Sequence, residues 1–370
     1  MAIFKFGDIV RDVKINVDRT NNPYDYYVAG DHMDSEDLTI HRHGNFATDD
    51  VGPAFTRIFK PGQILYGSRR TYLKKVAVAD FGGICANTTF VLESKDESVF
   101  ITHLLPFIML SDAFTRWSIA HSKGSTNPYV LFSDLADFEL DLPTIEEQRI
   151  LADKLWAAYR LKESYKKLLT ATQEMVKSQF IEMFGNPVAN NKGWNTMAIK
   201  QVAPEEPSRE RQTGTVWILN LDMIESHTGK IIDKVYDEDT NLLSVAPFDE
   251  GNVLYSKLRP YLNKVVIPKG KGYATTELVP LRPNQEYLNL TFFSHLLRGD
   301  DFVTYANTIS SGTKMPRMPL NDLRNFQCIL PPMEEQLKFE NVAEQADKSE
   351  FELRKSIEAI DQVIKSLINN

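Results

Sequence analysis

Arginine, lysine and tyrosine residues are concentrated in two short segments, which run from Tyr66 to Lys75 and from Tyr255 to Lys264. Arginine side chains bind guanine edges or phosphates, lysines suit phosphates, and tyrosines stack or donate hydrogen bonds. Tyr66 and Tyr255 follow apolar residues, so we expect both to be structural. The other cations and tyrosines predict DNA contacts, and they are Arg69, Arg70, Tyr72, Lys74, Lys75, Lys257, Arg259, Tyr261 and Lys264. The alternative is a solvated hairpin whose tyrosines belong to the core.

Two glycine-containing loops add candidate anion contacts. Gly124-Ser125-Thr126 and Ser311-Gly312-Thr313-Lys314 each come shortly before a proline, and such loops can present backbone N–H groups to an anion. We expect these loops to contact phosphate or a partner subunit, with a plain turn as the alternative. The residues assigned to this contact are Lys123, Thr126, Thr313, Lys314 and Arg317.

Two enzyme-like patterns are present in weakened form. Asn22-Pro23-Tyr24 and Asn127-Pro128-Tyr129 resemble the motif of amino-methyltransferases, but each lacks one proline and no glycine-rich cofactor loop follows a strand. Asp80, Glu93 and Lys95 have the order of a metal-dependent nuclease, in which carboxylates hold Mg²⁺ near a lysine. An internal repeat, described below, does not retain this nuclease pattern, so both interpretations are disfavoured.

A metal site is also conceivable in one polar segment of the chain. The nitrogen and oxygen ligands there are His32, Asp34, His41 and His43. Their spacing fits zinc coordination poorly, and we favour a polar loop.

The whole chain is an internal repeat with a period of about 190 residues. Phe59, Gly62, Tyr66, Arg70, Tyr72 and Lys75 match Phe248, Gly251, Tyr255, Arg259, Tyr261 and Lys264 in the same order. At the positions of Glu93 and Lys95 the second copy has Leu281 and Pro283. The sequence therefore predicts two copies of one unit, each a globular domain followed by a long helix.

Each copy ends in a long amphipathic segment. The first begins at Thr144, a candidate N-cap with Glu147 three residues later, and stops at Gly185. A narrow apolar stripe on each predicts that the two helices pair with each other, antiparallel, as a coiled coil. Lys162 and Glu350 interrupt the stripes at equivalent positions, and we expect them to face each other. The predicted pairing residues are Leu151, Leu155, Lys162, Tyr165, Leu169, Glu350, Leu353, Ile357, Ile360 and Ile364.

The globular parts are predicted to be mixed α/β, which makes the fold class α/β (mixed α+β) with pseudo-twofold symmetry. Strands are expected at 63–66 with 75–79 and at 252–255 with 264–267, and one helix per copy at 99–121 and 288–308. Pro106 should start or bend the first of these helices. The expected divisions are 1–143, 144–185, 186–331 and 332–370.

Composition sets loose bounds on the class of protein. The chain has 370 residues, of which 42% are hydrophobic and 25% charged, and these values are ordinary for a globular protein of two or more domains. No apolar run approaches the roughly 18 residues of a membrane span. The two cysteines, Cys85 and Cys328, suggest no disulfide and hence the cytoplasm. A net charge of −8 argues against general coating of DNA but allows local basic surfaces.

Two variable α/β domains alternating with two long helices resemble the DNA specificity subunit of type I restriction–modification systems. The segment from Lys177 to Pro187, followed by Gly193-Trp194, is similar to that family's junction between the first helix and the second domain. The Leu-Pro-x-x-x-Glu-Gln segments at 142–148 and 330–336 match the family's helix starts. The resemblance covers the full chain.

The resemblance implies a non-catalytic bacterial or archaeal subunit that binds double-stranded DNA. Each globular domain would bind one half of a split site, and the helices would set the spacer. Two methyltransferase subunits would dock along the helices, and ATP-dependent restriction subunits would join for cleavage. S-adenosylmethionine, ATP and Mg²⁺ are then expected in the partner subunits and not in this chain. The competing interpretation is a repeat scaffold whose basic hairpins are incidental.

Overall fold

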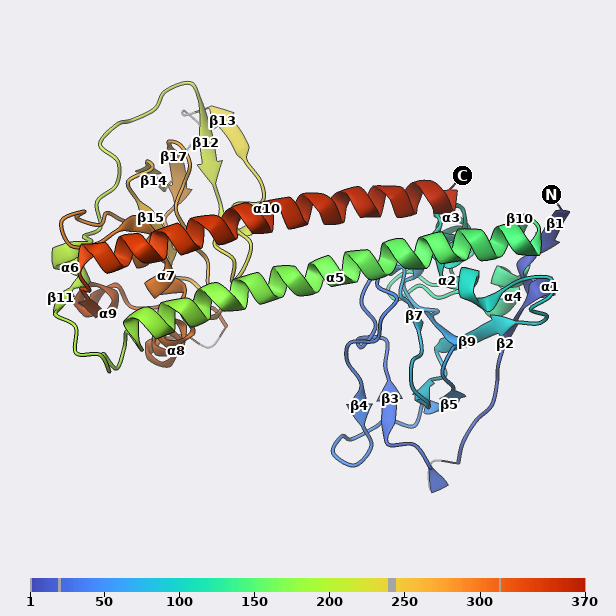
Figure 1. Ribbon diagram of the computed structural model, residues 1–370. Helices are drawn as coiled ribbons and strands as arrows, with labels where there is room; N and C mark the ends of the chain where they lie inside the picture. The colour runs from blue at the N-terminus through green and yellow to red at the C-terminus, as the bar shows by residue number, and fades with distance from the viewer. Residues whose placement is uncertain (1, 19–20, 239–243, 313, 370) are drawn as a thin grey trace. The chain divides into compact units, whose positions relative to one another are not determined.

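The computed structural model describes residues 2–18, 21–238, 244–312 and 314–369, which form two compact units (Figure 1). The first unit comprises Met1–Lys166 and Lys355–Asn370, and the second comprises Lys167–Arg354. Two long helices, α5 (Ile145–Phe184) and α10 (Met333–Asn369), each contribute a segment to both units. The predicted long helices are therefore confirmed. The units group each globular region with parts of both helices, whereas the sequence-based division separated helices from domains.

The first unit contains three small sheets. One sheet is an antiparallel pair of strands, and the other two sheets have four strands each. In order within the sheets, the strands are β1 (Ala2–Lys5) and β10 (Glu139–Leu142); β2 (Val10–Asp12), β9 (Thr89–Ser94), β6 (Ile64–Gly67) and β7 (Val76–Val78); and β4 (Gly44–Asn45), β3 (Tyr26–Val28), β8 (Gly83–Ala86) and β5 (Phe55–Phe59). Only β3 and β8 pair in parallel among these strands.

The second unit repeats this plan. Its strands are β11 (Thr196–Ala198) and β19 (Gln327–Ile329); β16 (Val265–Val266), β15 (Val253–Ser256) and β18 (Leu278–Leu281); and β13 (Val235–Glu238), β12 (Thr215–Leu219), β17 (Gly272–Thr275) and β14 (Val245–Phe248). Here β12 and β17 are the parallel pair, equivalent to β3 and β8. The shared topology confirms the internal repeat and the mixed α/β class. The predicted hairpins are confirmed as β6–β7 and β15–β16.

The helices of the globular regions differ from the prediction of one per copy. Each region has a pair of short helices where one was expected, because the backbone is extended at Ser111 and at Gly299. The pairs are α2 (Leu105–Leu110) with α3 (Asp112–Ala120), and α7 (Leu290–Arg298) with α8 (Asp300–Ile309). Pro106 lies in the first turn of α2, as expected. The remaining short helices are α1 (Phe6–Ile9), α4 (Phe132–Ala136), α6 (Ile199–Val202) and α9 (Leu320–Asn325).

Each long helix has a buried glutamine near its start, and the two glutamines make equivalent hydrogen bonds. In the first unit, Gln148 donates from Nε2 to the carbonyls of Val99 (3.0 Å) and Pro143 (3.1 Å). In the second unit, Gln336 donates in the same way to Tyr287 (2.9 Å) and Pro331 (2.8 Å). These bonds satisfy backbone groups that burial would otherwise leave unpaired. The Glu-Gln motif thus fixes each helix start onto its globular region.

The capping box predicted for α5 is present. Thr144 Oγ1 accepts from the Glu147 N–H at 3.3 Å, and Thr144 N–H donates to Glu147 Oε2 at 2.9 Å. Each bond satisfies an otherwise orphaned backbone donor at the helix start.

Within each unit, α5 and α10 pack antiparallel. In the first unit Leu155 and Ile364 are buried in one core cluster, and Lys162 Nζ lies 2.5 Å from Asp361 Oδ1. In the second unit the Phe180 and Phe184 rings both contact the Phe339 ring, with centroids 5.3 and 5.7 Å apart.

The expected pairing of Lys162 with Glu350 is wrong. Lys162 bonds Asp361, about three helical turns further along α10. Glu350 is buried and accepts from Gln173 (3.3 Å) and from Lys230. Aromatic packing in the second unit explains the difference, because burying the rings around Phe339 selects a register that apolar periodicity does not specify.

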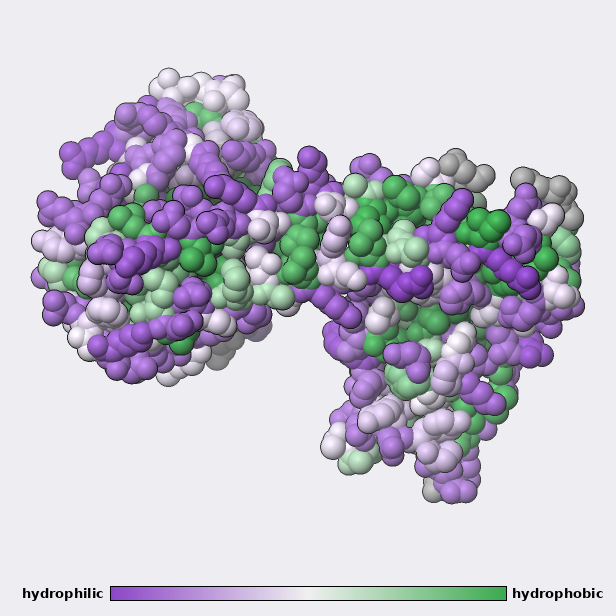
Figure 2. Space-filling view, viewed as in Figure 1, coloured by the Kyte–Doolittle hydropathy of each residue, from purple (hydrophilic) through white to green (hydrophobic). Residues whose placement is uncertain are grey.

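The other predicted pairing residues vary in burial. Leu155, Ile364 and Glu350 are buried, and the rest are half-buried: Leu151, Lys162, Tyr165, Leu169, Leu353, Ile357 and Ile360. Among the other apolar residues of α5, Leu161, Leu168 and Met175 are exposed. The visible surface of each unit likewise mixes hydrophobic with hydrophilic residues (Figure 2). None of the helices in the described ranges has the length and apolar character of a membrane span.

Candidate nucleic-acid interface

The two basic segments form the same backbone turn in both units. In the first, β6 leads through a 3₁₀ turn at Thr71–Leu73 into β7. In the second, β15 leads through a 3₁₀ turn at Pro260–Leu262 into β16. The residues that flank each turn are left-handed, with φ of +48° at Arg70, +47° at Lys74, +49° at Arg259 and +48° at Asn263. We call these segments, 67–75 and 256–264, the twin turns.

Each twin turn packs on the glycine-containing loop of its own unit. Arg70 N–H donates to the Pro128 carbonyl at 2.6 Å, and Arg259 N–H donates to the Pro316 carbonyl at 2.7 Å. In the first unit, an isolated β-bridge between Arg69 and Tyr129 reinforces this contact. The structure therefore brings together the two predicted groups of DNA-binding residues. Pro128 and Pro316 occupy equivalent positions in the repeat, and this equivalence was the sequence signal for their shared role.

The outer residues of the first twin turn are available for contacts. Arg69 and Arg70 are exposed, and the Tyr72 side chain is 54% exposed. Within the described residues, none of these three side chains makes a hydrogen bond or an ion pair.

The second twin turn is partly covered. Lys257 and Arg259 are half-buried, and Tyr261 is 45% exposed. The Nε atom of Arg259 is buried, and no hydrogen-bond partner for it lies in the described part of the chain.

Three lysines of the twin turns are engaged inside the protein. Lys75 donates to the Gly30 carbonyl and, at the equivalent position, Lys264 donates to the Leu221 carbonyl at 2.6 Å. Lys74 lies 3.1 Å from Glu36 and 3.6 Å from Asp112, and its side chain is only 17% exposed. These ammonium groups hold the turns in place, so the structure does not support them as free phosphate contacts.

The glycine-containing loops carry surface ion pairs. Lys123 lies 2.9 Å from Asp134, and its ammonium lowers the pKa of that carboxyl. Arg317 lies 2.9 Å from Glu277 and likewise lowers the pKa of that carboxyl. Exposed pairs of this kind contribute little to stability, so a phosphate could replace the carboxylate. Thr126 and Lys314 are exposed, and Thr313 lies outside the described residues.

Tyr66 and Tyr255 are core residues, as expected from the sequence. Their side chains are 2% and 3% exposed, and burial raises the pKa of both phenols. The predicted division between structural and exposed tyrosines in the two segments is confirmed.

The nuclease-like residues each bind a different part of the first unit. Glu93 pairs with Arg11 at 2.5 Å and accepts from Gln63 at 2.7 Å, whereas Lys95 donates to the Gly7 carbonyl. Asp80 is exposed. Glu93 and Lys95 therefore have separate structural partners, which gives no support to a nuclease site.

The four residues weighed as a possible metal site, for which a polar loop was favoured, also have other partners. His32 accepts from the Ala29 N–H, Asp34 pairs with Arg42, and His43 stacks beside Tyr26.

His41 belongs to a different group, with Asp37 and Glu163. Their ligand atoms lie within 4.8 Å of one another, and this is the one such group in the described ranges. The Lys166 ammonium lies 3.2 Å from Asp37 and 2.8 Å from Glu163. An internal cation thus neutralises the position that a metal would take.

Comparisons with known proteins agree with this geometry. Residues 3–171 match the family model described as the type I restriction modification DNA specificity domain. The type I restriction enzyme EcoDI specificity subunit of Escherichia coli is 23% identical over 318 residues, which cover 72% of this chain and 70% of that protein.

Two solved structures share the fold. One, titled for complex assembly and conformational transition of the type I R-M system, matches with a TM-score of 0.57 at 18% identity and covers 99% of this chain and 96% of its own. The type I restriction-modification S subunit of M. genitalium matches with a TM-score of 0.59 at 12% identity, covering 99% and 94%. At such identities the structural likeness shows the fold.

The repeated mixed α/β regions with two long helices are the fold that this chain shares with the solved type I structures. Residues 3–171 match the type I restriction modification DNA specificity domain, and the chain is similar over most of its length to specificity subunits of type I restriction–modification systems, which supports a role in DNA sequence specificity.

Proposed function

We propose that the chain binds a two-part double-stranded DNA site, with each twin turn and its glycine-containing loop contacting one part. The supporting observation is that both units build the same arginine–tyrosine turn on the same loop, with an exposed Arg70 in the first unit and a half-buried Arg259 at the equivalent position of the second. Proteins position themselves on DNA with cations and backbone N–H groups on phosphates, and they read sequence through base edges. Two copies of one such surface suit two half-sites.

The chemistry of modification then belongs to partner subunits. Two methyltransferase subunits that use S-adenosylmethionine would assemble with this chain and act on the DNA that it selects. Restriction subunits that use ATP and Mg²⁺ would join where the system also cuts DNA. In this proposal the chain is non-catalytic and works in the cytoplasm of a bacterium or archaeon. Glu93 is paired with Arg11 and Lys95 with the Gly7 carbonyl, which supports this assignment over a nuclease.

A salt titration of DNA binding tests the proposal. Fluorescence anisotropy would follow the full chain, alone and with its methyltransferase subunits, on duplex DNA at increasing salt. Phosphate contacts by several cations predict a steep linear fall of log affinity with log salt concentration. The double variant Arg70→Ala/Arg259→Ala should bind more weakly with a shallower slope. Absence of binding, or binding that ignores salt, would instead favour the scaffold interpretation.

A further inference from the structure

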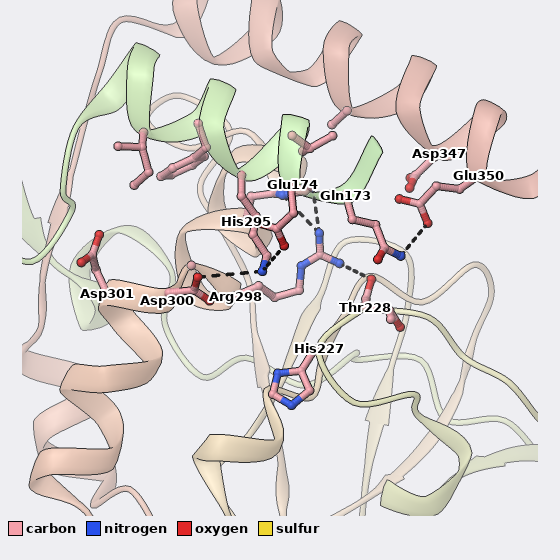
Figure 3. Close-up of a pocket in the computed structure, with 16 residues that line it drawn as sticks. Gln173, Glu174, His227, Thr228, His295, Arg298, Asp300, Asp301, Asp347 and Glu350 are labelled. Carbon is pink, nitrogen blue, oxygen red and sulfur yellow. Dashed lines mark hydrogen bonds and ion pairs between the residues drawn. The ribbon is translucent and has the colours of Figure 1, made fainter. Parts of the chain in front are cut away.

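A cavity of about 480 Å³ lies within the second unit (Figure 3). This volume falls in the range of small-molecule sites, roughly 300–1,000 Å³. Segments of α5 and α10, the junction of α7 with α8, and the turn at 227–228 line it. Apolar side chains form part of the wall, namely Val176, Phe180, Ile181 and Ala343.

The first unit has the repeat-equivalent cavity, but it measures only about 40 Å³. The lining residues correspond position by position along the repeat. Leu110, Asp112, Tyr159, Lys162 and Asp361 line the small cavity, and Arg298, Asp300, Asp347, Glu350 and Gln173 line the large one. The same place in the repeated fold is therefore nearly filled in the first unit and forms an open cavity in the second.

Lysine side chains close the small cavity. The Lys74 ammonium lies 3.1 Å from Glu36 and 3.6 Å from Asp112, and Lys162 lies 2.5 Å from Asp361.

At the equivalents of both lysines the second unit has no ammonium group. Asn263 has the same left-handed backbone as Lys74, with φ of +48° against +47°, but its side chain is too short to reach across. Its Nδ2 donates to the Arg298 carbonyl at 2.8 Å, and its Oδ1 has no hydrogen-bond partner within the described ranges. Lys162 is replaced by Glu350, so the second unit loses two cations and gains a carboxylate.

The linings of the two cavities therefore differ in their charge. Three lysines and three carboxylates line the small cavity, whereas two cations and five carboxylates line the large one. Of the two cations, Lys177 already pairs with Glu174 at 3.1 Å and lies 3.8 Å from Asp300.

The other cation, Arg298, is directed at neutral groups. It donates to the Thr228 carbonyl at 2.7 Å and lies 2.9 Å from His295 Nε2, as Figure 3 shows. Burial lowers the pKa of His295, so this ring adds no positive charge near neutral pH.

Two carboxylates that line the large cavity, Asp301 and Asp347, have no direct partner among the described residues. Asp347 is an exposed residue of α10, and partial desolvation of its carboxyl beside the cavity raises its pKa. Its neighbour on α10, Glu350, already pairs with Lys230.

We propose that the large cavity binds a small aliphatic diamine or polyamine. One ammonium group takes the place that the Lys74 ammonium holds in the first unit, next to Asp300, the equivalent of Asp112. A second ammonium group pairs with Asp347. The methylene chain between them lies against Val176, Phe180 and Ala343. The occupant is thus the chemical equivalent of the lysine side chain that closes the sister cavity.

Isothermal titration calorimetry of the DNA-free full chain with spermidine tests this site, at fixed ionic strength. We expect saturable binding at one site per chain. Asp347→Asn should weaken it about tenfold or more, since it removes a charge-assisted hydrogen bond. Glu344→Gln is the matched control, because it removes the same charge from an exposed position of the same helix outside the cavity. Its affinity should equal that of the wild type.

Asn263→Lys provides an independent test by rebuilding the arrangement of the first unit. Lysine is compatible with this backbone, as Lys74 shows, and its ammonium would occupy the cavity from within. This variant should lose spermidine binding and melt at a higher temperature than the wild type. The proposal would be overturned if the wild type shows no saturable binding. It would also be overturned if Asp347→Asn and Asn263→Lys both keep wild-type affinity, or if Glu344→Gln loses as much affinity as Asp347→Asn. Since no DNA is present, the outcome is independent of the proposed DNA-binding function.

Discussion

Arg70 and Arg259 occupy the same left-handed position of the twin turns, and their backbone N–H groups are already bonded to proline carbonyls. Their guanidinium groups are therefore the parts that can contact DNA. We predict that Arg70→Ala and Arg259→Ala each weaken DNA binding by about 1–3 kcal/mol without unfolding the protein. Anisotropy titrations on duplexes with one half-site scrambled should assign each loss to one half-site.

The control for both arginine variants is Arg149→Ala, on the exposed face of α5. This variant should bind as the wild type does. Wild-type affinity in both twin-turn variants would refute the assignment.

Asp37 supplies a pH-dependent contribution to stability. Burial opposes its ionisation, but hydrogen bonds from Tyr159 Oη (2.6 Å) and Thr39 N–H (3.0 Å), together with Lys166, lower the pKa of Asp37 to about 2. The unfolded value is about 3.9, so the carboxylate stabilises the fold above about pH 4. This stabilisation is lost as pH falls from about 4 to 2.

Tyr159→Phe should therefore raise the pKa of Asp37 and destabilise the protein by about 1–2 kcal/mol at neutral pH. The variant should also lose less stability than the wild type between about pH 4 and pH 2. Urea unfolding at several pH values measures both effects. Tyr165→Phe, on the same helix, should leave the wild-type pH profile unchanged. Parallel pH profiles for Tyr159→Phe and the wild type would contradict the assignment.

The sequence allowed us to predict which tyrosines of the twin turns are buried. It did not reveal which lysines of the turns bond to backbone carbonyls inside the protein. Tyr66 and Tyr255 follow apolar residues, and this pattern correctly marked them as core. Lys75 and Lys264 lie in the same basic segments as the exposed arginines, and their carbonyl acceptors on Gly30 and Leu221 are about 45 residues earlier in the chain. Local composition contains no information about such distant partners.

At the scale of elements, the observed helix register makes a quantitative prediction. Lys162 and Asp361 are 2.5 Å apart, and the Lys162 side chain is 12% exposed. A double-mutant cycle with Lys162→Met and Asp361→Leu should give a coupling energy of about 1 kcal/mol in thermal unfolding. A cycle between Lys162→Met and Glu350→Gln, the pairing expected from sequence, should be additive within about 0.5 kcal/mol. The reverse pattern would refute the register.

The sequence predicted the existence and ends of the long helices because capping and stop signals are local. Thr144 with Glu147 marks the start of α5, and its end at Phe184 precedes the Gly-Asn-Pro segment. The breaks at Ser111 and Gly299 were missed although polar residues mark both, since Ser111-Asp112 and Gly299-Asp300 each begin a second helix. The register was missed because it depends on packing of Phe339 with two rings of the other helix.

At the scale of the whole molecule, the repeat predicts that the two globular regions work separately. Replacing Met1–Leu142 by the equivalent region of another family member should change one half of the methylated sequence and leave the other half unchanged. The replacement must keep apolar residues facing Leu155 and Ile364, which belong to the same core cluster. Methylation sequencing of cells that carry the chimera measures the outcome, and alteration of both halves would contradict separate recognition.

The first unit is assembled from two segments of chain, 1–166 and 355–370, that the entire second unit separates. A ribosome therefore synthesises the second unit before it makes the strip of α10 that carries Ile360, Ile364 and Leu367 into the first core. During that interval Leu155 and Tyr159 lack their final cover. The core of the first unit can therefore be completed only after the whole second unit has been synthesised.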